Sequence, residues 1–272
     1  VDFWTYSCIN CIRTQPYLNA WYEKYEKDGL VIIGLHAPEF AFEKIENNVR
    51  EASQKAGIKY PIALDNDFKT WSAYANRYWP AKYLIDQNGN IVYKHFWEGK
   101  YEETEQKIQE LLWAKRELEK ELEKSWKQKT PETYLGSSRA QRVSITEWSY
   151  KNGTEKFLPW TLDLHDFTLG WFWTVSDEYI QSGAMSELAL RFSGKKVYLV
   201  VSFADENTDK KSFLSTTITD ATGKVIWWWK IDINADGIYT VFDGEEYVPD
   251  ATLQIYAPNT RPVRLHAFTF WD

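Results

Sequence analysis

The two cysteines of this 272-residue chain, Cys8 and Cys11, lie only two residues apart in the stretch SCINC. A pair at this spacing is a thiol–disulfide couple, half of a metal site, or a chance arrangement. A zinc site needs four protein ligands, or three and a water molecule. The chain has no second Cys-x-x-Cys pair, and its four histidines are scattered, at His36, His95, His165 and His266. The pair therefore favours redox chemistry and no metal.

The elements around the pair are those that a reactive thiol needs. Val1–Trp4 is typical of the end of a buried strand, Thr5–Asn10 of a polar turn, and Cys11–Glu26 has helical spacing. Cys8 is thus expected at a helix N-terminus, where the unpaired N–H groups and the helix dipole lower the pKa of a thiol. We expect Cys8 to attack a partner disulfide and Cys11 to resolve the mixed disulfide, with no dissociable cofactor.

The rest of the first half alternates strands and helices, which predicts an α/β domain over residues 1–128. Leu30–Leu35 (LVIIGL) is expected to be a central parallel strand covered on both faces. Asn88-Gly89 is a strong hairpin signal. The other expected strands are Pro61–Leu64, Ala81–Asp86 and Asn90–Trp97, and the other expected helices are Phe42–Ala56, Phe68–Tyr78 and Tyr101–Lys127.

Past Thr130-Pro131 the pattern changes to short strands separated by turns. We expect residues 129–150 to be a linker and the first part of the second domain, and residues 151–272 to form an antiparallel β-sandwich. Its expected strands are Glu187–Phe192, Lys196–Phe203, Phe213–Thr219, Lys224–Ile231, Ile238–Phe242, Ala251–Tyr256 and Arg264–Phe270.

Aromatic residues are unusually frequent, at 17% with fifteen Trp. On a strand, alternate residues of the run Trp227, Trp228, Trp229 face opposite sides, and Trp171 and Trp173 alternate with other residues in the same way. Core packing is the default interpretation. The alternatives are a face that stacks on sugars and a protein interface.

A second motif in this half is DINADG, formed by Asp232, Asn234, Asp236 and Gly237. It superficially resembles a calcium loop. It lacks the downstream Glu spacing of an EF-hand, so an Asp-rich turn is the favoured interpretation.

The net charge and the hydropathy pattern limit the kinds of partner that the chain is expected to bind. The net charge of −7 argues against nucleic acid, which needs a basic surface. No apolar run approaches the ~20 residues of a membrane span. The chain opens on Val1, without Met, directly into an apolar run. We therefore expect it to be an internal fragment whose precursor carries a signal or membrane domain upstream.

The stretch VDFWTYSCINCIRTQPYLNAWYEKY, together with YPIALDNDFKTWSAYANRYWPAKYLIDQNGNIVYKHFWEGKYEETE, resembles the thioredoxin-like region of DipZ-type cytochrome c biogenesis proteins, a branch of the TlpA/ResA oxidoreductases. TPETYLGSSRAQ is similar to the segment that follows it, and LRFSGKKVYLVVS and VRLHAFTFWD resemble the carbohydrate-binding-module-like domain of that family. The resemblance implies a TlpA-type thioredoxin-like domain, truncated at the N-terminal strands, followed by an all-β sandwich of the jelly-roll or carbohydrate-module kind.

The resemblance also implies roles for single residues. Trp79-Pro80 matches the cis-proline position, where the Trp79 backbone pairs with a substrate strand; a plain helix stop is the alternative for Pro80. Glu39 falls where relatives place an active-site glutamate that takes a proton from Cys11; an exposed loop carboxylate is equally compatible. Trp4 is expected to pack under the Cys8–Cys11 disulfide, a position that core packing alone also explains.

The function implied is that of an extracytoplasmic thiol-disulfide oxidoreductase, a reductase of protein disulfides linked to cytochrome c biogenesis. Its electrons would come from a membrane donor of the CcdA/DsbD type, in the same precursor, which would also anchor it. The dipeptide Ile9-Asn10 departs from the Gly-Pro of thioredoxin, so thioredoxin's potential does not transfer, and an oxidant or isomerase stays open. The alternative class is a binding protein whose β-sandwich recognises glycan or a partner protein and targets the redox domain.

Overall fold

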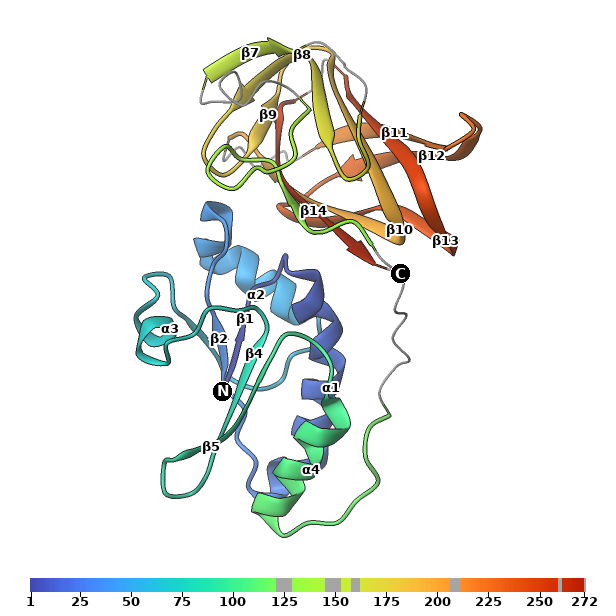
Figure 1. Ribbon diagram of the computed structural model, residues 1–272. Helices are drawn as coiled ribbons and strands as arrows, with labels where there is room; N and C mark the ends of the chain where they lie inside the picture. The colour runs from blue at the N-terminus through green and yellow to red at the C-terminus, as the bar shows by residue number, and fades with distance from the viewer. Residues whose placement is uncertain (121–128, 145–152, 158–161, 206–210, 259–260, 272) are drawn as a thin grey trace. The chain divides into compact units, whose positions relative to one another are not determined.

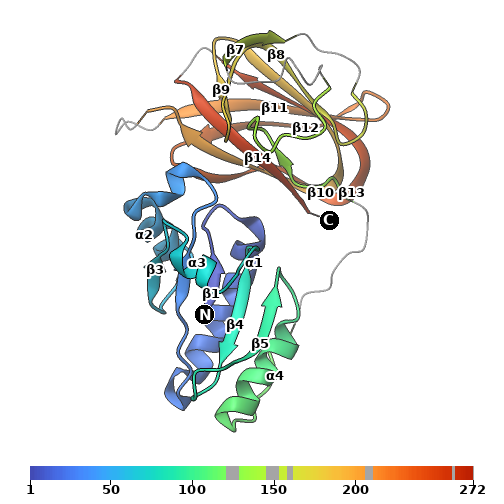
Figure 2. The ribbon, with the colours of Figure 1, turned by 60° about the vertical axis from the view of Figure 1, so that its left-hand side comes forward.

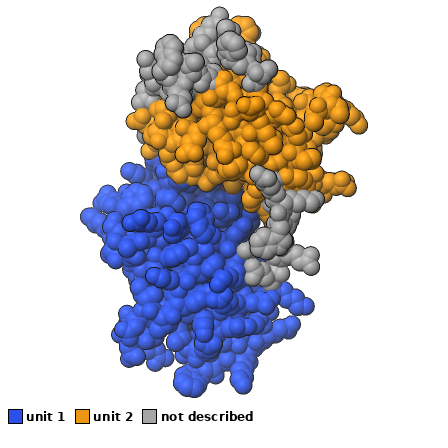
Figure 3. Space-filling view, in the orientation of Figure 1, with its two compact units in different colours: residues 1–124 blue, residues 125–272 orange. Residues whose placement is uncertain are grey.

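The computed structural model describes residues 1–120, 129–144, 153–157, 162–205, 211–258 and 261–271, with the backbone alone for 153–157. The chain forms two compact units, Val1–Lys124 and Ser125–Asp272, called here the first and the second unit and coloured separately in Figure 3. Among the helices of the described residues, none combines the length and the apolar composition needed to cross a bilayer.

The first unit is built around a five-stranded sheet with strand order β3-β2-β1-β4-β5. β1, β2 and β3 are parallel, β4 is antiparallel to β1, and β5 is antiparallel to β4; Figure 2 shows β1, β4 and β5 side by side. This is a thioredoxin-like fold. In chain order its elements are β1 (Asp2–Trp4), α1 (Ile9–Tyr25), η1 (Glu26–Asp28), β2 (Gly34–His36), η2 (Ala41–Lys44), α2 (Glu46–Lys55), β3 (Ile62–Leu64), α3 (Lys69–Ala73), β4 (Ala81–Ile85), β5 (Ile91–Phe96) and α4 (Tyr101–Leu112).

Helices cover both faces of this sheet (Figure 1). On one face, Trp21 of α1 packs in one apolar cluster with Tyr101 and Ile108 of α4. On the other face, Trp71 and Tyr74 of the α3 region pack edge-on against Phe3 of β1. The contacts of Phe3 anchor β1 directly before the loop that carries the cysteines.

The strand expected over Leu30–Leu35 is shorter and shifted, because β2 spans only Gly34–His36. Its ladder with β1 begins at the pair Asp2↔Gly34. Val31 lies ahead of that ladder and is 70% exposed. The expectation of a continuous run buried on both faces was therefore wrong for its first half: apolar composition alone does not distinguish a paired segment from an unpaired one.

The expected long helix over Tyr101–Lys127 ends at Leu112 instead. Trp113 takes a left-handed backbone, and the N–H of Ala114 closes the helix by donating to the Gln109 carbonyl. The chain then turns back, where the buried Glu105 carboxylate accepts the N–H of Glu119. Residues 121–127 of the expected helix lie outside the described residues.

Two other expected helices are shorter than predicted. The one over Phe42–Ala56 is split into η2 and α2, because Ile45 between them has an extended backbone. The one over Phe68–Tyr78 is reduced to α3, beyond which Ala75 has a φ of 50°. Such left-handed conformations interrupt a helix for reasons of tertiary packing that helical periodicity does not contain.

The second unit consists of antiparallel strands in the path β12-β11-β13-β10-β14-β9-β8-β7, with β6 paired to β14. Residues 145–150 of the segment expected to be a linker and the first part of the second domain lie outside the described residues. The prediction contained no strand before Glu187, so β6 to β9 were missed. The strands are β6 (Thr133–Tyr134), β7 (Gly153–Phe157), β8 (Phe167–Val175), β9 (Ile180–Ser182), β10 (Ser186–Phe203), β11 (Ser212–Asp220), β12 (Val225–Ile233), β13 (Gly237–Ala257) and β14 (Val263–Trp271).

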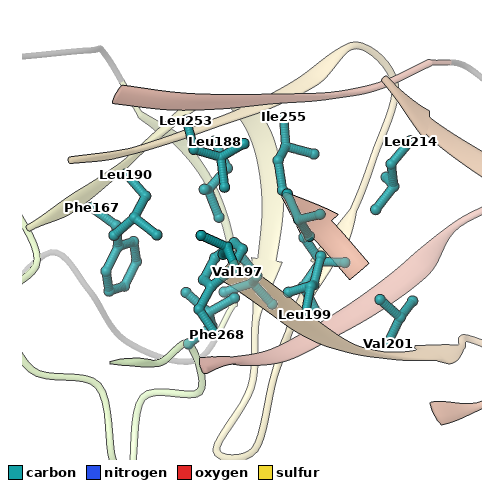
Figure 4. Close-up of a cluster of buried hydrophobic side chains, with 14 of the residues drawn as sticks. Phe167, Leu188, Leu190, Val197, Leu199, Val201, Leu214, Leu253, Ile255 and Phe268 are labelled. Carbon is teal, nitrogen blue, oxygen red and sulfur yellow. The ribbon is translucent and has the colours of Figure 1, made fainter. Parts of the chain in front are cut away.

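Two of these strands are long and bent. β10 covers both Glu187–Phe192 and Lys196–Phe203, and β13 covers both Ile238–Phe242 and Ala251–Tyr256. The register between them shifts on either side of Gly194. The first half of β10 pairs with β8 and the second half with β14, so the sheet folds into the two layers of a sandwich. Figure 4 shows apolar side chains of β8, β10, β11, β13 and β14 gathered between the layers.

Candidate active site

Cys8 is the N-cap residue of α1 and is partly exposed. The backbone N–H of Cys11 donates to Cys8 Sγ at 3.3 Å. The sulfur therefore occupies the place that a Ser or Asp oxygen takes in an ordinary N-cap. Hydrogen bonding from a helix N-terminus favours the thiolate over the thiol, because the amide dipoles point their positive ends at the sulfur. The expected placement of Cys8 is what the structure has.

Cys11 lies one turn further into α1 and is 1% exposed. Burial raises the pKa of the Cys11 thiol well above its usual range, and the hydrogen bond and charge of Cys8 raise it further. The charge of Asp2 acts in the same direction, and a backbone hydrogen bond of Thr5 opposes it. A thiol with a raised pKa is protonated at neutral pH, so Cys11 needs a proton acceptor before it attacks.

Asp2 is a second buried ionisable group of the site, 2% exposed on β1 and opposite Lys82 of β4. Burial raises the pKa of Asp2 to about 6, against the lowering effect of the positive charges of Lys82 and the chain's amino group. Within the described residues, Asp2 Oδ1 has no hydrogen-bond partner. A carboxylate that titrates near neutral pH and whose charge acts on Cys11 has the properties of a proton acceptor for that thiol.

Glu43 of η2 is the third such group and has no exposed surface. Its Oε1 accepts the Ser7 hydroxyl at 2.5 Å and the Ser7 backbone N–H at 3.4 Å. Its Oε2 accepts the backbone N–H groups of Glu39 and of Phe40, the latter at 3.0 Å. Burial raises the pKa of Glu43 to about 7, although these hydrogen bonds oppose the shift.

The Trp79-Pro80 peptide bond is cis, as the resemblance implies. Pro80 immediately precedes β4, whose Ala81 pairs with Phe3, so Pro80 and the cysteine loop lie at the same edge of the sheet. The Trp79 indole N–H donates to the Ala37 carbonyl at 2.9 Å, and the Trp97 backbone N–H donates to the Pro80 carbonyl at 2.8 Å. The cis-proline segment is thus held from both sides.

Trp4 and Glu39, the other residues predicted for the site, differ in their burial and contacts. Trp4 is 1% exposed and packs edge-on against His36, with ring centroids 5.1 Å apart. Glu39 is half-buried and donates its backbone N–H to Glu43; its role as proton acceptor stays a prediction. Sequence reasoning missed Asp2 and Glu43. Asp2 had a signal, a charge inside the apolar run VDFW, whereas Glu43 had none in its local pattern.

Comparison with known proteins decides the family. Residues 1–94 match the AhpC/TSA family, and residues 130–270, more than half of the chain, match the family described as "Thioredoxin like C-terminal domain". The chain belongs to this thioredoxin-like C-terminal domain family. It is 39% identical to Protein DipZ of Mycobacterium bovis over 212 residues, which cover 74% of this chain and 30% of DipZ. The chain thus spans about 30% of the length of that relative.

Two shorter similarities concern the first unit. The thiol-disulfide oxidoreductase ResA of Bacillus cereus is 32% identical over 111 residues, which cover 41% of this chain and 61% of ResA. The crystal structure of StoA from Bacillus subtilis aligns with a TM-score of 0.35 and 19% identity, covering 39% of this chain and 77% of StoA.

In the C-terminal domain that gives the family its description, the predicted aromatic residues have unequal environments. Trp173 has no exposed surface and donates its indole N–H to the carbonyls of Gly170 and Glu187, so it belongs to the core and not to a ligand face. Trp171 is 44% exposed, because its φ of 67° turns it away from the face that Trp173 occupies.

The run on β12 follows the expected alternation more closely. Trp227 packs against the core and lies edge-on to Phe242, with centroids 5.5 Å apart. Trp228 is 68% exposed and points to the opposite face. Trp229 pairs with the buried Thr216, on the side of Trp227, yet stays largely exposed because β12 is the last strand of the path.

The DINADG segment has structural partners of its own. Asp236 accepts the backbone N–H of Phe203 at 2.9 Å, and Asp232 forms an ion pair with Lys230 at 2.8 Å. The Tyr239 hydroxyl accepts the backbone N–H of Asn234 at 3.2 Å. These contacts tie the turn to β10 and β13 and match the interpretation of DINADG as an Asp-rich turn.

Proposed function

We propose that this protein is a thiol-disulfide oxidoreductase that reduces disulfides of other proteins through Cys8 and Cys11. One observation carries the proposal: a partly exposed Cys8 Sγ sits at the N-cap of α1 and accepts the Cys11 N–H, with the Cys11 thiol buried directly behind it. This arrangement pairs an accessible attacking sulfur with a shielded resolving sulfur. The similarity to ResA and DipZ supports the same chemistry.

The reaction runs in two thiol–disulfide exchanges. The Cys8 thiolate attacks one sulfur of the substrate disulfide; a Cys8–substrate disulfide forms, and the other substrate sulfur leaves as a thiolate that takes up a proton. Cys11 then loses its proton and attacks Cys8 Sγ, which releases the second substrate thiolate and leaves a Cys8–Cys11 disulfide. The substrate gains two electrons, and the site loses two.

The surrounding residues serve these two steps. Asp2 accepts the Cys11 proton, because its carboxyl has a pKa of about 6 and its charge acts on that thiol. Glu39 is the alternative acceptor. The Trp79 backbone, beside Pro80, pairs with an extended substrate segment as an added strand.

The oxidised site must be reduced again by another thiol. We propose a membrane donor of the CcdA/DsbD type, in the same precursor, since this chain spans about 30% of DipZ. The first unit would then work outside the cytoplasm, attached to the membrane, with apocytochrome c as one substrate class. The net charge of −7 fits protein partners better than nucleic acid.

Cysteine substitutions test the proposal with a disulfide-bonded protein substrate such as insulin. Cys8→Ser is expected to abolish reduction, and Cys11→Ser to accumulate a mixed disulfide, because attack then occurs without resolution. Full activity of Cys8→Ser would contradict the proposal. Equilibration with dithiothreitol measures the reduction potential of the Cys8–Cys11 couple and so the direction of electron transfer. A potential of roughly −270 mV fits a reductase, and one of roughly −120 mV fits a disulfide donor.

A second function is favoured by one face of the second unit. Trp228 pairs with Thr217, which pairs with Gln254, and in the next row Lys230, Ser215 and Tyr256 lie side by side. Trp228 and Tyr256 are 68% and 37% exposed. Exposed aromatic rings among hydroxyl and amide groups suit stacking on a sugar. We propose glycan binding here, tested by cell-wall glycan pull-down of the full chain; binding that persists in Trp228→Ala would contradict this site.

A further inference from the structure

The turn that presents Cys8 is held by η2, a segment thirty-odd residues away in the chain. The Cys8 N–H donates to the Thr5 carbonyl at 3.4 Å, which closes a turn with Tyr6 and Ser7 at its centre. Ser7 donates twice to Glu43 Oε1, and the Tyr6 hydroxyl donates to the Phe42 carbonyl at 3.5 Å. Both central residues of the turn therefore contact η2.

The local role of Glu43 does not explain this geometry. As the third residue of η2, Glu43 caps its own turn, and Oε2 alone serves that purpose by accepting the N–H groups of Glu39 and Phe40. Oε1 is left to reach Ser7, 36 residues away in sequence. A cap on the surface would need no burial, yet this carboxyl has no exposed surface.

A buried polar chain continues beneath the turn. The Thr5 hydroxyl lies 3.2 Å from His36 Nε2. Thr5 and His36 have no exposed surface, and Ser7 is 2% exposed. Burying so many polar groups is costly unless their geometry is satisfied. The cluster therefore allows the turn little freedom.

We propose that Glu43 is a positioning residue for Cys8: by binding both donors of Ser7 it holds Cys8 Sγ at the N-terminus of α1, and thereby sets the reactivity of that thiol. This inference rests on the proposed role of Cys8 as the attacking sulfur. Holding the sulfur at the Cys11 N–H stabilises the reduced form, because a thiolate gains more from the amide than a disulfide does. Release of the turn should slow attack and favour the disulfide.

The test uses the full chain in three variants: Ser7→Ala, Glu43→Gln and the double variant. Ser7→Ala removes one donor and leaves the Glu43 carboxyl group itself in place. Glu43→Gln keeps the side-chain length but replaces one of two oxygens that together face four donors. We expect each single variant to slow alkylation of Cys8 by iodoacetamide at pH 7 about fivefold, as for the loss of one hydrogen bond.

A second readout is the equilibrium of the Cys8–Cys11 couple with glutathione. We expect it to shift about fivefold toward the protein disulfide; a tenfold shift corresponds to about 30 mV. Cys8 in the double variant should be alkylated no more slowly than in the slower of the two single variants. Both substitutions break the same contact, the one between Ser7 and Glu43. Glu46→Gln, at the exposed start of α2, is the matched control and should leave both readouts unchanged.

Ser7→Ala decides the outcome. An unchanged or faster alkylation rate overturns the proposal whatever Glu43→Gln does, and so do independent, additive effects of the two substitutions. If Glu43→Gln does not fold, the Ser7→Ala rate and equilibrium decide alone. Alkylation needs no substrate disulfide, so insulin reduction by the wild-type chain reports separately on the proposed function.

Discussion

The two units bury different kinds of polar group. In the first unit, Asp2, Cys11 and Glu43 are all buried around one turn, and burial raises the pKa of each of them. In the described part of the second unit, the buried polar side chains are hydroxyls and one histidine, His266. The Ser202 hydroxyl lies 2.8 Å from His266 Nε2, and burial lowers the histidine's pKa to about 3.

This contrast distinguishes buried groups that can take part in a reaction from buried groups that only stabilise the fold. Buried carboxyl and thiol groups lose stability when they ionise, and such groups gather where protons and electrons are transferred, whereas the neutral His266 serves as a hydrogen-bond partner. In the described part of the second unit, Arg191 and Asp250 form a partly exposed ion pair, with nitrogen–oxygen distances of 2.8 and 2.7 Å. The exposed Trp228 and Tyr256 of this unit suit recognition of a partner surface. The contrast supports both proposals: that the first unit carries the redox reaction and that the second unit carries a binding surface.

The largest expected effect separates core from surface within the second unit. Trp173→Ala should lower the free energy of unfolding of the second unit by about 3–5 kcal/mol, because it leaves a cavity and two carbonyls without their donor. Trp228→Ala is the matched substitution of an exposed Trp, and it should change the free energy of unfolding by no more than about 0.5 kcal/mol. Urea unfolding followed by circular dichroism measures both. Equal losses in the two variants would contradict the assignment of Trp173 to the core and Trp228 to the surface.

A slightly smaller effect concerns Asp2 and depends on pH. The pKa of Asp2 in the folded protein, about 6, lies above the ordinary value of 3.8. Below pH 3.8 the carboxyl is protonated in both the folded and the unfolded chain, so its burial does not lower the free energy of unfolding. That free energy falls as the pH rises through 6, because the buried carboxyl must then ionise. A pKa of about 6 in place of 3.8 corresponds to a loss of about 3 kcal/mol of stability once Asp2 is ionised. Asp2→Asn should therefore be more stable than the wild type by up to about 3 kcal/mol at pH 8, with the gain vanishing near pH 3.5.

The same variant should lose activity while it gains stability. Without an acceptor for the Cys11 proton, resolution of the mixed disulfide should slow at least ~10-fold in insulin reduction. Asp67→Asn is the control, because its carboxylate is 76% exposed. A stability gain that is the same at pH 4 and pH 8 would show that burial of the Asp2 charge is not its source.

Local pattern was enough to predict the order of elements in the first unit and the position of Cys8 at a helix start. These features depend on neighbours in sequence, such as the apolar run before the cysteines and the helical spacing after them. Glu43 was missed because its partner Ser7 lies 36 residues away. Asp2 was missed although a charge in an apolar strand is itself a signal.

The second unit was harder to predict for the opposite reason. Gly194 looks like a break between strands, yet β10 runs through it by shifting register. Trp171 and Trp173 should share a face by alternation, but the positive φ of Trp171 separates them. Turn-type residues and two-residue periodicity describe straight strands, whereas the folded-over sheet is built from bent ones.

The smallest expected effect tests whether the first unit also has a recognition surface. Trp97 is 51% exposed, its ring centroid lies 5.1 Å from that of Tyr78, and its backbone N–H donates to the Pro80 carbonyl. The pair flanks the cis-proline where a substrate segment would dock. Trp97→Ala should raise the KM for insulin about fivefold and leave kcat unchanged, because an aromatic contact contributes about 1 kcal/mol to binding. Trp113→Ala, a 95% exposed Trp after α4, is the control. A fall in kcat at constant KM would place Trp97 in the reaction and weaken the division between a unit that reacts and a unit that binds.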